Sequence, residues 1–209
     1  MRTVAVLPVK SFPKAKQRLT AGVEPSLRRE LAAAMFADVL AALAASAVDD
    51  VVVVTAGAPA AAHAAAHGAR VVSDAEQGHN AAAQIGVEAA LALGAERALL
   101  VPGDCPMLDP GEIDQLLARQ GGERSVLIVP DRHGTGTNAL LITPPDALTP
   151  AFGPGSCRRH AALAAAQGIA HAVIEVPSLA LDIDTPEDLD ALGDLADRAP
   201  RTHGLLTRC

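Results

Sequence analysis

Three aspartates beside strand-like segments have the residue type and spacing best suited to chemistry in this sequence. Asp182 and Asp184 stand two residues apart in "DIDTP", and Asp104 follows an apolar run in "VPGDCPML". Side chains two apart on an extended chain point to the same side, and Asp104 opposite them would complete a carboxylate pocket. Mutual repulsion in such a pocket is offset by a cation, and Mg²⁺ binds carboxylate oxygens. The spacing therefore predicts a Mg²⁺ site, with turn capping as the alternative for Asp104.

A basic loop follows the first strand-like run. Within nine positions of a chain whose formal net charge is −7, it contains Lys10, Lys14, Lys16 and Arg18. Several converging cations would stabilise a triphosphate and the charge that develops during phosphoryl transfer. A solvated loop is the alternative, because charge runs usually face water. The GxxxxGK[ST] pattern is absent, which disfavours a Walker-type ATPase.

Two glycine-rich segments, "GTGT" at 134–137 and "FGPGS" at 152–156, could together form an anion pocket. The first predicts exposed backbone N–H groups and two hydroxyls. The second places Ser156 near the start of an expected helix, where anions bind favourably. Either segment alone could be only a turn, but the pair predicts a pocket for phosphate or carboxylate. Solvated helix positions are expected for the residues that follow, Arg158, Arg159 and His160.

Asn80 lies where the third strand-like run leads into a helix, in "SDAEQGHNAAAQIG". Its simplest interpretation is a helix N-cap, since asparagine is among the preferred capping residues. The functional alternative is a contact with the base or sugar of a nucleotide.

Apolar, β-branched runs alternate with Ala- and Leu-rich helical segments along the chain. The expected strands span residues 3–9, 50–55, 69–73, 97–102, 125–130, 138–143 and 171–177. The expected helices are 26–43, 58–67, 80–93, 110–119, 157–167 and 186–197, the first capped by Ser26 and two others by Asp109 and Thr185. Several strand runs are continuously hydrophobic, which is typical of strands covered on both faces.

This alternation predicts an α/β protein with a three-layer α/β/α, Rossmann-like fold and a mostly parallel central sheet. A small antiparallel portion is expected at 125–143, where two strands are joined without room for a crossover helix. We expect a single domain over 1–199 and a flexible tail over 200–209, either frayed or a minor docking arm. Ligands bind such sheets at the carboxyl ends of the strands.

Composition excludes several classes of protein. With 50% hydrophobic residues among 209, a substantial core is expected, and a pI near 5.4 argues against a nucleic-acid-binding surface. Three cysteines without a CxxC pair suggest neither a disulfide framework nor a zinc site. No apolar run is long enough to suggest a secretion signal or a bilayer span. We expect a soluble, cytoplasmic protein with no membrane or nucleic-acid partner.

The motifs taken together resemble a known family. "PVK", "AKQRL", "GDCP", "GTGTNALL", "FGPGS" and "LDIDTPEDL" occur in the order found in the phosphoenolpyruvate or 2-phospho-L-lactate guanylyltransferases of deazaflavin coenzyme F-420 biosynthesis. These belong to nucleotidyltransferases similar to the molybdenum-cofactor guanylyltransferases, and the match spans residues 3–192. The usual glycine-rich opening of that class is replaced here by "PVKSFPKAK".

The resemblance implies a nucleotidyltransferase fold and a reaction of GTP with a phosphorylated three-carbon acid that releases pyrophosphate. Phosphoenolpyruvate is the expected acceptor, because heavy use of alanine and arginine suggests a GC-rich genome; 2-phospho-L-lactate and 3-phospho-D-glycerate are alternatives. The resemblance implies Mg²⁺ on Asp104, Asp182 and Asp184, and the acceptor phosphate on Thr137, Gly153 and Ser156. We assign the nucleotide to Pro8, Lys10, Lys14, Lys16, Arg18 and Asn80, and catalysis to Lys10, Lys16 and Asp104.

Two rival functions fit the same pattern. One is a nucleotidyltransferase that acts on a sugar phosphate or molybdopterin, and the other is a nucleotide-binding regulatory domain without activity. Three aspartates argue against a pure binding domain, which has little use for them. Apolar helix faces could support a homodimer.

Overall fold

A computed structural model of the chain describes residues 1–10, 24–119, 122–190, 192 and 198–208. Its sheet has the strand order β3-β2-β1-β4-β6-β5-β7. The strands are β1 (Thr3–Pro8), β2 (Asp50–Thr55), β3 (Arg70–Ser73), β4 (Arg97–Leu100), β5 (Ser125–Pro130), β6 (Thr137–Thr143) and β7 (Ala170–Val173). β6 runs antiparallel to both β4 and β5, and the other neighbouring pairs are parallel. The predicted mixed sheet, with its antiparallel portion at 125–143, is confirmed.

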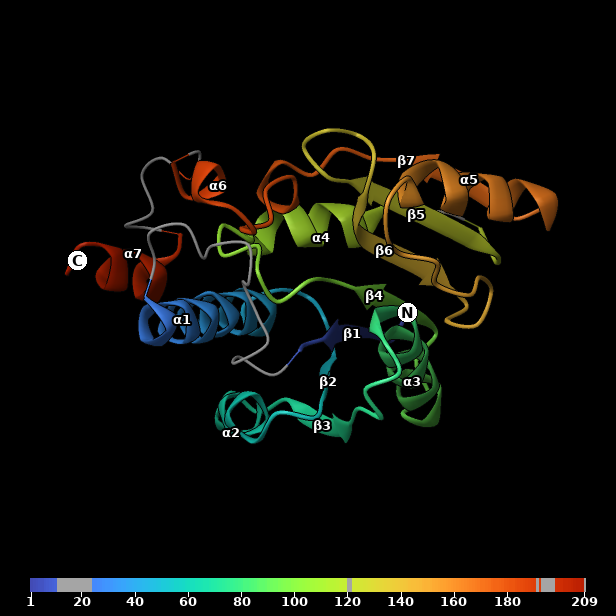
Figure 1. The fold of residues 1–209 in the computed structure, drawn as a ribbon. Helices are drawn as coiled ribbons and strands as arrows, with labels where there is room; N and C mark the ends of the chain where they lie inside the picture. The colour runs from blue at the N-terminus through green and yellow to red at the C-terminus, as the bar shows by residue number, and fades with distance from the viewer. Residues whose placement is uncertain (11–23, 120–121, 191, 193–197, 209) are drawn as a thin grey trace.

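Helices cover both faces of this sheet, as the three-layer prediction requires (Figure 1). On one face lie α1 (Pro25–Ala44), α2 (Ala58–Ala66) and α4 (Pro110–Ala118), and on the other lie α3 (His79–Ala92) and α5 (Ser156–Ala166). The remaining short elements are η3 (Pro177–Leu179), α6 (Pro186–Asp190) and α7 (Pro200–Leu206). The expected helix over 186–197 is observed as α6, and 191 and 193–197 lie outside the described residues.

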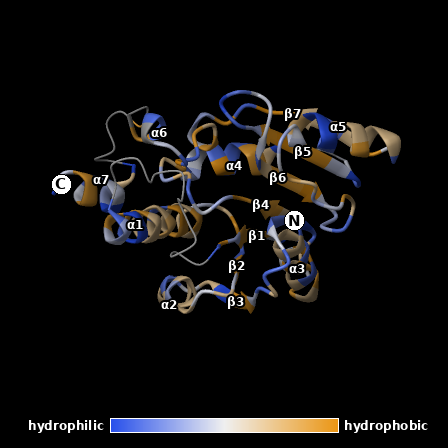
Figure 2. Ribbon diagram, viewed as in Figure 1, coloured by the Kyte–Doolittle hydropathy of each residue, from blue (hydrophilic) through white to orange (hydrophobic). Residues whose placement is uncertain are grey.

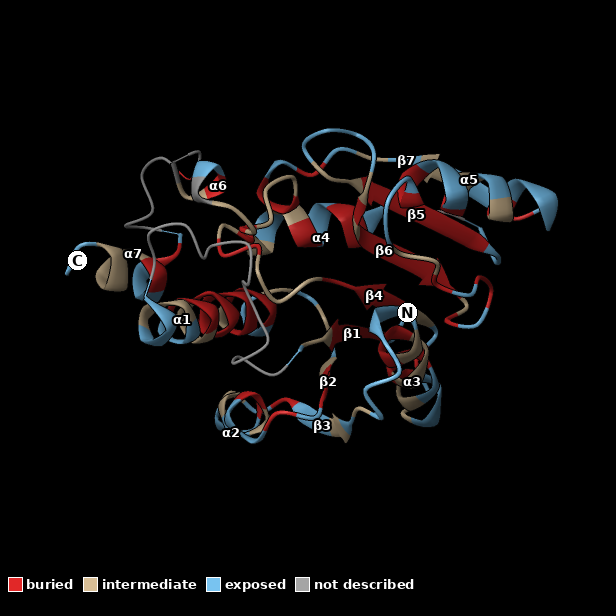
Figure 3. Cartoon of the chain, viewed as in Figure 1, coloured by how far each residue is buried: buried red, intermediate tan, exposed pale blue. Residues whose placement is uncertain are grey.

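Alternation along β1 shows why its sequence is apolar without a break. Ala5 and Leu7 pack under α1, whereas Val4 and Val6 pack under α3, and all four are fully buried. Hydrophobic residues therefore continue through the centre of the sheet (Figure 2), which is buried on both faces (Figure 3). Gly86 of α3 completes this packing, because a Cβ there would overlap with Cγ1 of Val6.

Two helix starts test the capping predictions. α1 begins one residue earlier than expected, at Pro25, and its N-cap Glu24 makes no side-chain capping bond. Proline suits this first position because its missing N–H is not needed there, so the prediction of Ser26 as the cap was wrong. The prediction for α4 is confirmed, since the Asp109 carboxylate accepts a hydrogen bond from the Glu112 N–H at 3.1 Å.

Replacing Asp109 by alanine should lower the free energy of unfolding by about 1 kcal/mol, the usual cost of removing an N-cap acceptor. Urea denaturation followed by circular dichroism measures the change. Asp146→Ala, at an exposed aspartate, is the matched control and should change stability little. Equal losses in the two variants would contradict a capping role.

Residues 200–206, expected in a frayed tail or a docking arm, form α7 beside α1 (Figure 1). The contact centres on Asp38 of α1, whose side chain is buried. Its carboxylate accepts hydrogen bonds from the Thr202 N–H at 2.9 Å and the Thr202 hydroxyl at 2.8 Å, and Arg201 pairs with it at 3.3 Å. A buried acid with these partners anchors α7 to the domain. None of the described helices is both long and apolar enough to cross a bilayer.

Candidate active site

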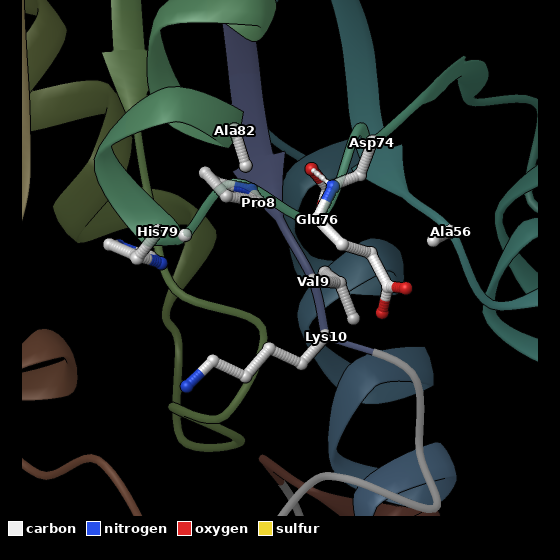
Figure 4. Close-up of a pocket in the computed structure, with 9 residues that line it drawn as sticks. Pro8, Val9, Lys10, Ala56, Asp74, Glu76, His79 and Ala82 are labelled. Atoms are coloured by element: carbon white, nitrogen blue, oxygen red, sulfur yellow. Dashed lines mark hydrogen bonds between the residues drawn. The ribbon is translucent and has the colours of Figure 1, made fainter.

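A cavity of about 210 Å³ opens where β1 and β3 end and α3 begins. Its lining includes Pro8 at the end of β1, Val9 and Lys10 just after it, and Gly78 and His79 at the start of α3. Figure 4 shows the Lys10 side chain extending from the end of β1 towards the same side of the cavity as His79. Pro8 and Lys10, both predicted to bind nucleotide, thus line one cavity at the carboxyl end of the sheet. Lys14, Lys16 and Arg18, also predicted there, lie outside the described residues.

Acidic residues form the other side of this cavity. Asp74 and Glu76 line it, and the Asp74 carboxylate accepts a hydrogen bond from the Glu76 N–H at 2.8 Å. The turn holds Glu76 at φ 54°, a left-handed conformation that is uncommon outside glycine. Carboxylates placed here can accept hydrogen bonds from ribose hydroxyls or from the N–H groups of a base. Sequence analysis missed both residues, although they stand at the exit of a predicted strand.

His79 connects the cavity to the aspartate predicted to catalyse the reaction. Burial lowers the pKa of His79; the charge of Asp104 opposes this and that of Lys10 adds to it. The imidazole is therefore neutral at neutral pH, and it lies within electrostatic range of both charged groups. The sequence gave no indication that His79 interacts with Asp104 and Lys10, because a histidine at the start of a helix is compatible with many structural roles.

The aspartate segments meet at the exits of two distant parts of the chain. The Ile183 N–H donates a hydrogen bond to the Asp104 carbonyl at 3.1 Å. Ile183 itself is fully buried in a small core cluster with Leu31 and Met35 of α1, which fixes the extended stretch that presents Asp182 and Asp184. Its two neighbours face away from that core because side chains alternate along an extended chain.

The charges of the other two aspartates, Asp104 and Asp184, both affect the pKa of Asp182. Burial raises the pKa of Asp182, and the charges of Asp104 and Asp184 raise it further, against a hydrogen bond from the Asn138 amide at 3.3 Å. The three aspartates thus lie on one side of the molecule. Across the described ranges, however, no three His, Cys, Asp or Glu side chains form a cluster that could hold a metal ion. The two aspartate segments are therefore adjacent, but their carboxylates do not form a cluster that could coordinate a metal ion by itself.

Asp188 fixes the main chain of the "DIDTP" segment. It is 5% exposed, and its carboxylate accepts hydrogen bonds from the N–H groups of Asp184 at 2.9 Å and Thr185 at 2.7 Å. Its other oxygen pairs with Arg132 at 2.5 Å. Burial acts to raise the pKa of Asp188, but these bonds and the Arg132 charge together lower it. Sequence analysis gave this residue no role in the site, and its partner Arg132 comes from a distant loop.

Asp131 organises the "GTGT" segment in a way that corrects one prediction. Its carboxylate accepts hydrogen bonds from the N–H groups of Thr135 at 2.9 Å and Gly136 at 2.8 Å. The N–H groups of 135 and 136, expected to be exposed for an anion, are therefore already bonded. A Cβ at Gly136 would lie 2.5 Å from an Asp131 carboxylate oxygen, so only glycine permits this approach.

The residues predicted to hold the acceptor come together from β6 and α5. Thr137 and Ser156 are both buried, and the Cys157 N–H donates to the Thr135 carbonyl at 3.2 Å, which joins the two segments. Gly153, at φ 119°, lies in the connection that leads into α5.

The side chain of Asn80 forms two hydrogen bonds with the backbone of the connection that leads into α5. It lies in the first turn of α3, whose N-cap is Gly78, so the N-cap prediction was wrong. Its amide nitrogen donates to the Phe152 carbonyl at 3.2 Å, and its amide oxygen accepts from the Phe152 N–H at 2.7 Å. The side chain therefore ties the segment predicted to hold the acceptor to the helix that lines the cavity, and its contact with a nucleotide stays a prediction.

A mixed α/β sheet of this kind, with a cavity at the ends of its parallel strands, is the fold of solved nucleotidyltransferases. A nucleotidyl transferase of Methanothermobacter thermautotrophicus superposes with a TM-score of 0.65 at 20% identity and covers 100% of this chain and 99% of that one. Glucosyl-3-phosphoglycerate synthase of Mycobacterium tuberculosis, solved with Mg²⁺ and uridine diphosphate, reaches 0.57 at 18% identity, over 100% and 79%. At these identities the likeness concerns the fold alone.

The family is defined by sequence. A family model described as "Guanylyl transferase CofC like" matches residues 3–194, and the chain belongs to this family. A phosphoenolpyruvate guanylyltransferase of Conexibacter woesei is 50% identical over 100% of this chain and 96% of its own length. A 3-phospho-D-glycerate guanylyltransferase of Colwellia psychrerythraea is 35% identical over 100% and 99%. The resemblance inferred from the motifs is confirmed.

Proposed function

We propose that the chain transfers the guanylyl group of GTP to phosphoenolpyruvate, giving enolpyruvyl-diphospho-guanosine and pyrophosphate. The observation that supports this proposal is that Asp104 and Asp182 interact with each other and each also interacts with a different part of the chain. Asp104 interacts electrostatically with His79, which lines the cavity proposed for the nucleotide. Asp182 accepts a hydrogen bond from Asn138, the neighbour of Thr137 in β6, and Thr137 is proposed to hold the acceptor. The relative that is 50% identical carries the name of this activity. The product would serve coenzyme F-420 biosynthesis.

The reaction needs positioning more than proton transfer. An oxygen of the acceptor phosphate attacks the α-phosphorus of GTP, and the bond to the bridging oxygen of pyrophosphate breaks. Because this nucleophile is already anionic at neutral pH, no general base is needed. The residues present here bring two anions together, and Lys10 and Lys16 lower their repulsion. Thr137, Gly153 and Ser156 would hold the acceptor, and Pro8 and the basic loop would hold GTP.

The donor set fits a hard divalent cation. Mg²⁺ commonly takes one or two carboxylates from a protein and its remaining ligands from phosphate and water. Asp182 and Asp104, with Asp184 beside them, would hold Mg²⁺, which would neutralise charge on the phosphates. Three carboxylates need not close around a point in advance, because the phosphates of GTP supply the other oxygens.

A second acceptor is favoured by one observation. The relative that is 35% identical over its full length bears the name of a 3-phospho-D-glycerate guanylyltransferase. This acid and 2-phospho-L-lactate share with phosphoenolpyruvate a phosphate and a carboxylate. 2-Phospho-L-lactate has a tetrahedral C2 where phosphoenolpyruvate has a planar one, and 3-phospho-D-glycerate carries its phosphate on C3 and a hydroxyl on C2. The same site could orient any of the three.

Competition among acceptors tests the proposal. The protein is incubated with GTP, Mg²⁺ and an equimolar mixture of the three acids, and the products are identified by mass spectrometry. We expect enolpyruvyl-diphospho-guanosine to dominate and its formation to stop when EDTA removes the metal. Activity confined to a sugar phosphate would overturn the proposal, as would binding of GTP without turnover of any acid. Homodimer formation and a cytoplasmic location stay predictions.

A further inference from the structure

His160 is a fully buried imidazole for which the proposed reaction has no use. The sequence suggested a solvated helix position, and this expectation was wrong, because its exposed fraction is 0%. Its Nε2 lies 2.9 Å from the Ala151 backbone nitrogen, and its Nδ1 lies 3.0 Å from Oγ1 of Thr137. The ring therefore stands between the two segments assigned to the acceptor, the strand that carries Thr137 and the connection that leads to Gly153.

The backbone contact determines which ring nitrogen carries the proton. A peptide N–H can only donate, so Nε2 of His160 must be the acceptor in its bond with Ala151. Burial, with the charge of Arg159 adding to it, lowers the pKa of His160 to about 4. The ring is thus neutral at neutral pH, with its single proton on Nδ1. That proton is donated to the Thr137 hydroxyl.

This arrangement leaves the Thr137 hydroxyl proton for another partner. The hydroxyl oxygen accepts from His160, and its own hydrogen must then point towards a different acceptor. We propose that His160 is a positioning residue that fixes the Thr137 hydroxyl as a hydrogen-bond donor to the anionic acceptor substrate. This inference rests on the proposed function, because it takes Thr137 as a contact of the phosphorylated acid. Donation to an anionic oxygen is stronger than donation to a neutral one.

The same ring also holds the acceptor connection in place. Both backbone polar groups of Ala151 are hydrogen-bonded. Its N–H donates to His160, and its carbonyl accepts from Nε of Arg159 at 2.9 Å. A second guanidinium nitrogen of Arg159 donates to the Pro154 carbonyl at 3.1 Å. Gly153 lies between these two points. Adjacent side chains of α5 therefore fix the backbone around Gly153 while one of them also orients Thr137.

Two substitutions separate these roles. Asparagine at 160 can place an amide N–H where Nδ1 stood, and so can still donate to Thr137. Glutamine at 160 can place its oxygen where Nε2 stood, and so can still accept from Ala151. We expect His160→Gln to raise the KM for the phosphorylated acid about tenfold, the effect of one lost hydrogen bond, with the KM for GTP unchanged. His160→Asn should stay closer to the wild type.

A double-mutant cycle keeps the inference separate from a general loss of packing. If His160 acts through Thr137, then His160→Gln should change the KM for the acid little in a Thr137→Val background. Equal KM values for His160→Gln and His160→Asn, or additive effects in the double variant, would overturn the inference.

An independent measurement does not need turnover. The ¹⁵N spectrum of histidine-labelled wild-type protein at pH 7 should show His160 as the neutral tautomer protonated at Nδ1, with Nε2 unprotonated. A proton on Nε2 would overturn the inference even in an active enzyme. If wild-type protein turns over none of the three acids, the proposed function fails. In that case the tautomer result decides whether Thr137 is still presented as a donor.

Discussion

Replacing Asp182 by asparagine should lower kcat with GTP and phosphoenolpyruvate by about 100-fold or more, the effect of removing a charge-stabilising group. The side chain is half-buried beside Asp104, so its charge is of use only with a cation between them. Asparagine has nearly the same shape and can still accept the hydrogen bond that Asn138 donates at 3.3 Å. The substitution therefore removes the charge and retains the local structure. Pyrophosphate release at saturating Mg²⁺ measures the change.

The Asp182→Asn substitution should also change thermal stability and its dependence on Mg²⁺. Without metal, like charges near Asp182 repel, so the asparagine variant should unfold at the same temperature as the wild type or at a higher one. Added Mg²⁺ should raise the unfolding temperature of the wild type more than that of the variant. Glu175→Gln, at an exposed acid just after β7, is the control and should leave both activity and metal response intact. Undiminished turnover in the Asp182 variant would remove the metal assignment.

The parts of this structure that sequence could predict are those determined by local pattern. The unbroken apolar run of β1 indicates a strand covered on both faces, and Ala5 and Val6 indeed pack into different core clusters. Asp109 before Pro110 gives a cap because both signals lie within one turn. In the "DIDTP" segment, alternation alone predicted that two acids share a side, and the buried Ile183 between them supplies the anchor.

The residues that sequence missed act through distant or backbone partners. Asp188 looked like part of a helix surface, because nothing in the sequence reveals that Arg132 approaches it from another loop. His160 looked solvated because its partners, Thr137 and Ala151, come from a strand and a connection. Asp131 is different, since it precedes the glycine-rich turn that it organises. An aspartate just before such a turn is a signal that could have been used.

The "GTGT" segment shows why a residue type can be predicted correctly for the wrong reason. Glycine at 136 suggested an open backbone ready to bind an anion. In the structure, the absence of a side chain at Gly136 allows its N–H to donate to the Asp131 carboxylate. The anion bound by this turn is therefore a side chain of the protein itself. If this segment holds the acceptor as proposed, we expect binding to depend more on side-chain hydroxyls than on the N–H groups of residues 135 and 136, which are already bonded.

Replacing Asp188 by alanine should lower the free energy of unfolding by about 2 kcal/mol, because it removes a buried carboxylate that accepts several hydrogen bonds. Arg132 is exposed and stays solvated without its partner, so loss of the ion pair itself adds little. The change also frees the N–H groups of Asp184 and Thr185, which the carboxylate now accepts at 2.9 Å and 2.7 Å. The segment that carries Asp182 and Asp184, the two aspartates proposed to hold metal, would lose its fixed conformation. We therefore expect a weaker response to Mg²⁺ as well as a lower midpoint in urea denaturation.

Two variants separate charge from geometry in this effect. Asp188→Asn can still accept from the two N–H groups through its amide oxygen but cannot pair with Arg132, so it should lose less stability than the alanine variant. Glu187→Ala removes an exposed acid from the same short helix and should be nearly neutral. If Asp188→Ala and Glu187→Ala gave equal unfolding midpoints and equal activity, Asp188 would be only a helix-surface residue. The conformation of the aspartate segment would then depend on the buried Ile183 alone.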